Sequence, residues 1–226
     1  MVTKKRFLIF MLLIFSSCHS QTSIKIVNDA CEPPCWQNII PGSSSTEQTL
    51  QNLQRLSGIE PSSIEVRDQP YKIFNKIIYT AVSDEQKISI FLIDDTVASI
   101  EFSGDFQISF GEAVEQFGEP QFIIITKTLG PGGLWASSIH TYVSIVYPEK
   151  GIMFEYDEYD QPRSLKSKIN PEIKLNKVAF FNPNQFEILA DSGFILSGSN
   201  LEQTQMAMQP WQGYGDIDAV YQLTRP

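Results

Sequence analysis

Two cysteines separated by three residues are the first candidates for chemistry in this sequence. Cys31 and Cys35 flank Pro33-Pro34 and are followed directly by Trp36. A metal site would need more ligands, and no histidine lies nearby; redox-active pairs are usually Cys-x-x-Cys in a thioredoxin-like context. Outside the cytoplasm such a pair favours a structural disulfide. We therefore predict a disulfide between Cys31 and Cys35 that holds Trp36 against the domain, and no metal or cofactor.

A third cysteine follows a short apolar segment near the start of the chain. Three basic residues, Lys4 to Arg6, precede the apolar run Phe7 to Phe15, and Ser16-Ser17-Cys18 follows. This order is typical of a secretory signal, and the run is too short to span a bilayer core, which needs about 20 residues. The segment Phe15 to Cys18 resembles a bacterial lipobox, with Phe15 where leucine is usual.

The lipobox resemblance implies that Cys18 is lipidated and becomes the first mature residue. Residues 1–17 would then be a removed signal peptide, and residues 18–30 a tether to the outer side of a bacterial membrane. The alternative is an ordinary secretory signal cut near Ser17 or Ser20. Both interpretations predict a protein exported from the cytoplasm, and the first adds a membrane anchor.

The charge balance limits the possible partners. The chain has a formal net charge of −9, and removal of residues 1–17 would change it to −12 because that segment carries three positive charges and no negative ones. An acidic chain without a basic cluster is repelled by phosphate backbones. We therefore expect no nucleic-acid partner.

The histidines and carboxylates do not form a recognisable catalytic pattern. His19 falls in the tether, and His140 falls in an alternating strand, where a surface or interface role is the simpler interpretation. No Gly-x-Ser-x-Gly, Ser-x-x-Lys or His-Glu-x-x-His motif occurs. The acidic run Asp157 to Asp160 lacks the spacing of a calcium loop and suggests a solvated turn. We predict a non-enzymatic protein; an envelope hydrolase using His140 or scattered carboxylates is the alternative.

A glycine-rich segment offers a candidate contact with a partner. Gly130 to Gly133 has no following Lys-Ser/Thr and leads into a strand, so it is not a phosphate loop. It could let Leu134 and Trp135 project from a hairpin tip as an anchor for a partner protein. The alternative is that Trp135 folds back onto the core.

The order of helix and strand signals along the sequence predicts a helix followed by strands, twice in succession. Serines and Thr46 start a first helix that ends before Gly58 and Pro61, and a second helix begins at Phe110 and ends at Gly118. Short turns between apolar, β-branched runs predict antiparallel strands. These runs cover residues 64–66, 76–82, 87–93 and 97–102, then 121–128, 139–147, 151–156 and 173–181. A further short helix is expected over residues 182–190.

The repeated unit suggests an internal duplication. Gly42 and Gly111 lie 69 residues apart, each beside a short helix, with strands after it. The alternative is a coincidence of two common patterns. The unit Ile-x-Pro-Gly or Phe-Gly, helix, Gly-x-Pro and strands resembles the SmpA/OmlA (BamE-like) lipoprotein domain, and tandem copies are similar to the β-lactamase inhibitor protein fold. The segments that carry this resemblance are residues 42–61 and 108–128.

The cysteine stretch, together with Trp211-x-Gly-Tyr-Gly, also resembles a set of uncharacterised bacterial lipoproteins. The BamE-like and inhibitor families imply helices packed on one face of an antiparallel sheet and action by binding other proteins. We therefore predict an α+β fold of two tandem units, residues 31–107 and 108–181, and a helix and loop-rich extension over residues 182–226.

The predicted function is a lipid-anchored module that binds a protein or envelope component. A hydrolase or a binder of small ligands or glycans is the alternative.

Overall fold

The computed structural model describes residues 31–82, 86–104, 106, 108–129, 138–162 and 168–221 of the chain. The proposed signal peptide, Cys18, His19, the tether, and Leu134 and Trp135 lie outside these residues. No helix in the described ranges is both long and apolar enough to cross a membrane.

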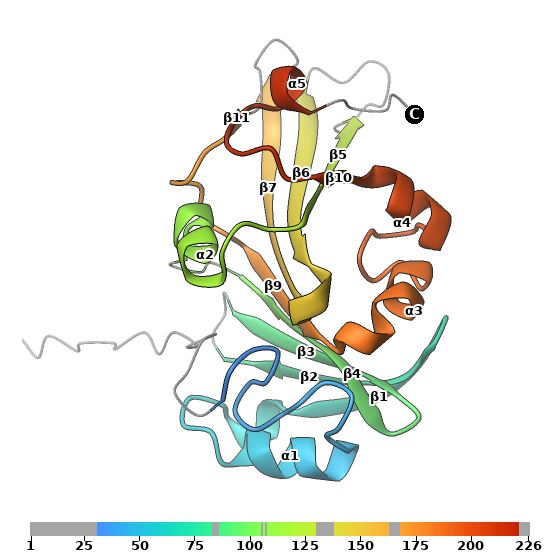
Figure 1. Cartoon of the computed structure of the whole chain (residues 1–226). Helices are drawn as coiled ribbons and strands as arrows, with labels where there is room; N and C mark the ends of the chain where they lie inside the picture. Colours follow the sequence, from blue (N-terminus) through green and yellow to red (C-terminus); the bar gives the residue numbers. More distant parts are fainter. Residues whose placement is uncertain are drawn as a thin grey trace, which may run out of the picture.

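The first half of the fold is one helix and a four-strand meander (Figure 1). Helix α1 (Thr46–Gln54) starts with a capping box: Ser45 Oγ accepts from the Gln48 N–H, and the Gln48 side chain accepts from the Ser45 N–H. Reciprocal bonds of this kind satisfy amides that a first turn leaves without partners. A 3-10 turn, η1 (Pro61–Ser63), then leads into strands β1 (Glu65–Tyr71), β2 (Phe74–Ala81), β3 (Lys87–Ile93) and β4 (Thr96–Ser103).

The second half has a similar order of elements. Helix α2 (Phe110–Phe117) has its own capping box, formed by Ser109 and Glu112, and ends at Gly118 in a conformation with positive φ. The following elements are β5 (Phe122–Leu129), β6 (Ser138–Tyr147), η3 (Pro148–Lys150), β7 (Ile152–Pro162), β8 (Lys168–Ile169) and β9 (Lys177–Phe181). The predicted helices and the main predicted strands are therefore confirmed.

Three predicted strand ends are wrong: β1 runs on to Tyr71, β9 starts only at Lys177, and β7 differs most. Strand β7 does not stop at Tyr156 but runs on to Pro162, which pairs with Ser138 of β6. Asp157 to Asp160 therefore belong to a strand and not to a solvated turn. Cross-strand pairing with β6 overrides the polar composition of this run.

All the main strands belong to one antiparallel sheet. Its nine strands lie in the order β1-β2-β3-β4-β9-β7-β6-β5-β10, and the halves meet where β4 pairs with β9. A separate pair is formed by β8 and β11 (Gly215–Asp216). The fold is thus α+β, with one large sheet and several short helices.

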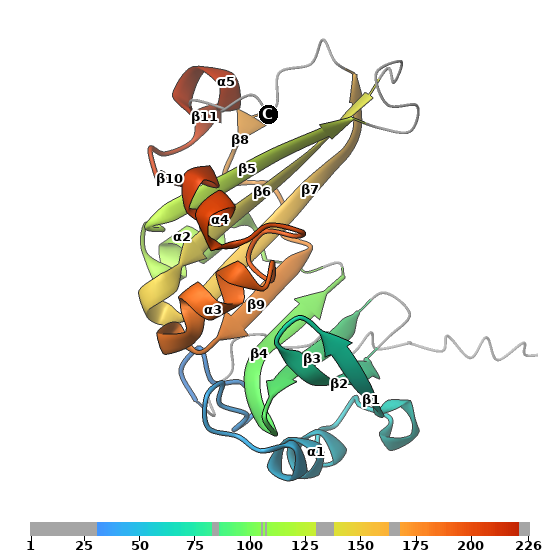
Figure 2. The ribbon, with the colours of Figure 1, turned by 90° about the vertical axis from the view of Figure 1, so that its right-hand side faces the viewer.

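Helices cover both faces of this sheet (Figures 1 and 2). Neighbouring residues of β9 point to opposite sides, so Phe180 and Phe181 belong to two different cores. The first face packs against Leu53 of α1, Phe110 of α2 and Ile217 of α5 (Ile217–Val220). The second face packs against α3 (Phe186–Asp191) and α4 (Leu201–Ala207).

The prediction that the helices lie on one face is therefore wrong. The physical reason can be found in β9, where Val178, Ala179, Phe180 and Phe181 are all buried. A continuous apolar run needs cover on both sides, unlike an alternating strand.

The C-terminal part contains more regular structure than the sequence pattern suggested. The predicted short helix forms as η4 (Pro183–Gln185) and α3. Helix α4 was not predicted; its sequence is largely polar, but Asn200 and Gln203 form a capping box at its start. Strand β10 (Met208–Pro210) then pairs with the beginning of β5 and adds the ninth strand.

Candidate binding surface

The cysteine pair is a structural feature at the entry to the domain. Cys31 and Cys35 form a disulfide with a Cα–Cα distance of 5.7 Å. Trp36 is 2% exposed, and its ring meets that of Phe102 edge to face at a centroid distance of 5.0 Å. Backbone hydrogen bonds run both ways between Trp36 and Ile39. The predicted pairing and the burial of Trp36 are thus confirmed.

The other groups considered for chemistry are not brought together. His140 is half-buried in β6, beside the register shift that separates the Ile139 and Thr141 pairs. The described part of the chain contains no group of three or more His, Cys, Asp or Glu side chains that could hold a metal ion. Tyr214 is 39% exposed and contacts Trp211 edge to face with ring centroids 5.4 Å apart.

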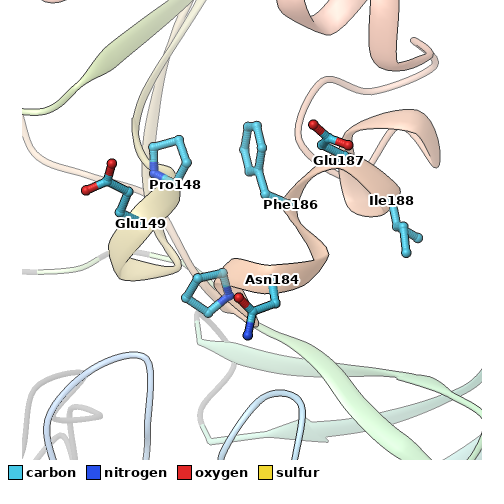
Figure 3. Close-up of a pocket in the computed structure, with 7 residues that line it drawn as sticks. Pro148, Glu149, Asn184, Phe186, Glu187 and Ile188 are labelled. Carbon is cyan, nitrogen blue, oxygen red and sulfur yellow. The ribbon is translucent and has the colours of Figure 1, made fainter.

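An open hollow of about 630 Å³ lies between η3 and the start of α3 (Figure 3). Pro148, Glu149 and Phe186 are among its lining residues, together with Glu187 and Ile188. The two carboxylates stand on opposite sides of the prolines and Phe186 and do not point toward one another. An acid–base pair needs converging groups, and this hollow does not supply them.

A cluster of three charged side chains on the second face of the sheet is the strongest candidate site. Lys177 Nζ of β9 lies 3.4 Å from Glu101 Oε2 of β4 and 3.5 Å from Glu155 Oε1 of β7. The Ser144 hydroxyl of β6 donates to Glu155 Oε2 at 2.9 Å. We call Glu101, Lys177 and Glu155 the charge cluster.

The strand register explains why these side chains meet. Lys177 is directly opposite Glu155, and Glu155 is directly opposite Ser144, so their side chains share one face. Glu101 pairs with Ala179, one diagonal step from Lys177. The neighbouring residues Phe102, Val178 and Phe154 face the opposite core.

The charge cluster is partly desolvated but reaches solvent. The side chains are 21% exposed at Glu101, 26% at Lys177 and 20% at Glu155. Burial raises the pKa of Glu101, and this effect outweighs the attraction to Lys177. Burial by itself would lower the pKa of Lys177, but the two carboxylates more than reverse that and raise it. Lys177 therefore stays protonated at neutral pH and cannot act as a nucleophile or base.

Further polar side chains continue this surface across the strands. Ser89 of β3 lies directly opposite Glu101, and Tyr79 of β2 lies opposite Ser89. On the other side of the cluster, Tyr142 of β6 lies opposite Asp157, whose Oδ1 accepts a hydrogen bond from Asn176 Nδ2. We define the polar face as Tyr79, Ser89, Glu101, Lys177, Glu155 and Tyr142.

The polar face borders the part of the second face that α3 and α4 cover. There Phe74, Phe91 and Phe194 form an aromatic group, and Ala179 and Met153 lie in the same core. The polar face thus combines a rigid sheet, half-exposed aromatic rings and preorganised charges. This arrangement can bind a polar surface, and it offers no nucleophile with an activating base.

Sequence reasoning missed the charge cluster. Its only local signal is a single charge inside an otherwise apolar strand, as in Ser99-Ile100-Glu101-Phe102 and Met153-Phe154-Glu155-Tyr156. Such a charge shows that one side of a strand is polar. It does not reveal which strands are neighbours, and β4 and β9 are far apart in the sequence.

Comparison of the chain with protein families, with curated proteins and with solved structures found no match.

Proposed function

We propose that this protein is a non-enzymatic module, tethered to a bacterial membrane on its outer side, that binds a partner protein through the polar face. The observation that carries the proposal is the charge cluster at the centre of the sheet. Partly buried charges cost free energy of desolvation, and an apolar set of the same size would often be at least as stable. Recognition of a partner protein would explain why the fold contains such a cluster despite this cost.

The geometry of the cluster suits recognition. Lys177 Nζ is shared between Glu101 Oε2 and Glu155 Oε1, so one ammonium group stands against two carboxylates. The cluster carries two carboxylates and one ammonium group, so it favours a partner that presents a cationic or hydrogen-bond-donating side chain. Its partial burial means that little water remains to be removed on binding.

The order of the elements supports the tandem duplication. Helix α1 with β1 to β4 corresponds to α2 with β5, β6, β7 and β9, and the last strands of the two units pair at the centre. Ser45 and Ser109 each cap a helix and each form a bridge to the segment at the last strand, at Thr96 and Lys174. This order is one argument for the proposed resemblance to tandem BamE-like and inhibitor-type units, whose families act by binding proteins.

The period of the duplication differs from the spacing of the two glycines. Gly42 lies in a turn before α1, with a φ of 86°, whereas Gly111 lies inside α2. The two glycines are therefore not equivalent positions. The equivalent caps, Ser45 and Ser109, are 64 residues apart.

The proposed anchor is the lipid on Cys18, followed by residues 18–30 as a tether. It would keep the polar face near the membrane surface and raise the local concentration of an envelope partner. Mass spectrometry of the mature N-terminus tests this part alone. A mature chain that starts beyond Cys18 would remove the anchor from the proposal.

Site-specific photo-crosslinking tests the binding surface. A photoreactive residue at Ser89, which lies on the polar face, is compared with one at Gln51, which is exposed on α1 at the other face. We expect a discrete crosslinked protein from Ser89 in intact cells and none from Gln51. The same product from both positions, or none from Ser89, would contradict the proposal.

A further inference from the structure

The two edges of the nine-stranded sheet differ in how they are protected. Strand β1 carries charged residues, Pro70, and a register shift between Asp68 and Tyr71. These features discourage pairing with another strand. Strand β5 pairs with β6 along all eight of its residues without a register shift. The outer edge of β5 is therefore regular.

Among the described strands, only β10 lies along this outer edge, and it covers the beginning of it. Strand β10 pairs with Phe122, Ile123 and Ile124, and no other described strand lies beside Ile125 to Leu129. Helix α4 ends where β10 begins, at Met208. The end of β5 extends beyond β10 at the margin of the sheet (Figures 1 and 2).

The direction of the uncovered backbone groups follows from the ladder. Gln121 O accepts a hydrogen bond from the Trp211 N–H, on the β10 side. Backbone groups alternate between the two neighbours of a strand, so Ile123, Ile125 and Lys127 also direct their N–H and C=O groups to this side. Ile123 is opposite Gln209, whereas Ile125 and Lys127 have no described strand opposite them.

Lys127, the one charged residue between Ile125 and Leu129, already forms an ion pair. Lys127 Nζ lies 2.7 Å from Asp218 Oδ1 of α5. A lysine on an edge usually hinders the approach of another strand, and the contact with Asp218 reduces that effect. A second copy of this chain fits less well, because both copies would carry the same formal net charge of −9 and repel each other.

We infer that the edge of β5 from Ile125 to Leu129 binds an extended segment of a partner protein, which adds a strand in line with β10. Main-chain hydrogen bonds at Ile125 and Lys127 recognise the segment. An apolar side chain opposite Ile125, which packs against the first core, would add selectivity. This surface is distinct from the polar face and extends the proposed protein-binding function to a second contact.

Amide hydrogen exchange of the full chain provides the first test. The amides of Ile125 and Lys127 are expected to exchange quickly, while those of Ile123, Ile124 and Thr126 are protected. Protection of Ile125 and Lys127 in the free chain would show that the edge is already covered, and would overturn the inference.

A matched pair of variants provides the second test. Lys127→Pro removes the outward N–H, whereas Lys127→Ala loses the same contact with Asp218 but keeps the N–H. The probe is a displayed library of random segments of about seven residues, long enough at about 3.3 Å per residue to span the open edge. Selected segments should bind the wild type and Lys127→Ala and bind Lys127→Pro about tenfold more weakly.

Three outcomes decide the matter. Equal binding to both variants, or no selected segment at all, contradicts the inference. A dimer that Lys127→Pro abolishes in analytical ultracentrifugation would assign the edge to a second copy instead. Lys177→Met should leave the selected segments bound, so loss of crosslinking at Ser89 and loss of segment binding report separately on the two surfaces.

Discussion

Replacing Lys177 by methionine should destabilise the fold through the charges that it leaves behind. Methionine keeps a similar length and can stay packed between the strands, but it removes the ammonium group between Glu101 and Glu155. The two carboxylates would then face each other on a partly desolvated surface. The loss therefore comes mainly from uncompensated charge and not from an empty space.

The distances set the size of this effect. A unit charge pair at 3.4 Å is worth about 5 kcal/mol at an effective dielectric constant of about 20, and about 1 kcal/mol in bulk water. The side chains are 20–26% exposed, so the environment lies between these limits. After the cost of removing water from the ion pairs, we expect Lys177→Met to lower the free energy of unfolding by about 2–3 kcal/mol at pH 7.

Urea unfolding followed by tryptophan fluorescence measures this loss. The matched control is the triple variant Lys177→Met, Glu101→Gln and Glu155→Gln, which has no charge left and should recover most of the stability. The loss in Lys177→Met should also shrink as the pH falls and the carboxylates become protonated. A loss below about 0.5 kcal/mol, or a triple variant as unstable as the single one, would refute the reasoning.

The remaining predictions concern the Cys31–Cys35 disulfide, Gly151 and the titration of Glu101. Replacing Cys31 and Cys35 by serine opens a five-residue loop and should lower the free energy of unfolding by about 2 kcal/mol, measured against the oxidised wild type; no change would show that the loop is held by other contacts. Gly151→Ala should cost more than about 3 kcal/mol in the same assay, because φ is 65° and a Cβ would lie 2.1 Å from Phe181 O; a near-neutral result would be inconsistent with this packing. Because the pKa of Glu101 is raised in the folded state, the wild type loses stability as the pH rises from the usual carboxyl value of 4.5 through the folded-state pKa. Across that range the stability of Glu101→Gln should therefore rise relative to that of the wild type. The same pH profile of unfolding in both proteins would argue against this assignment.

Local patterns were enough to predict the elements that the chain builds from neighbouring residues. Ser45 and Ser109 precede Gln48 and Glu112 by three positions, and both helices start there. The alternating run of β3 is buried at Ile88, Ile90 and Leu92, as the period of two requires. Capping and strand alternation act over a few residues, so the sequence displays them directly.

Features that depend on distant contacts could not be predicted in this way. The polar sequence of α4 conceals a helix whose apolar side covers the second face, and strand β10 exists only because β5 offers it an edge. The charge cluster requires β4, β9 and β7 to be neighbours, an order that no local pattern specifies. The candidate anchors Leu134 and Trp135 remain predictions, because they lie outside the described residues.

The central claim is that the polar face binds a protein, and crosslinking from Ser89 in an exchange variant tests it most directly. Glu101→Lys combined with Lys177→Glu keeps the net charge and an ion pair within the cluster but changes where the positive charge stands. We predict that the variant is less stable than the wild type, because it places a carboxylate directly opposite Glu155, but that it still folds and loses the crosslinked protein. A folded variant that keeps the same crosslinked protein with the same yield would contradict the claim.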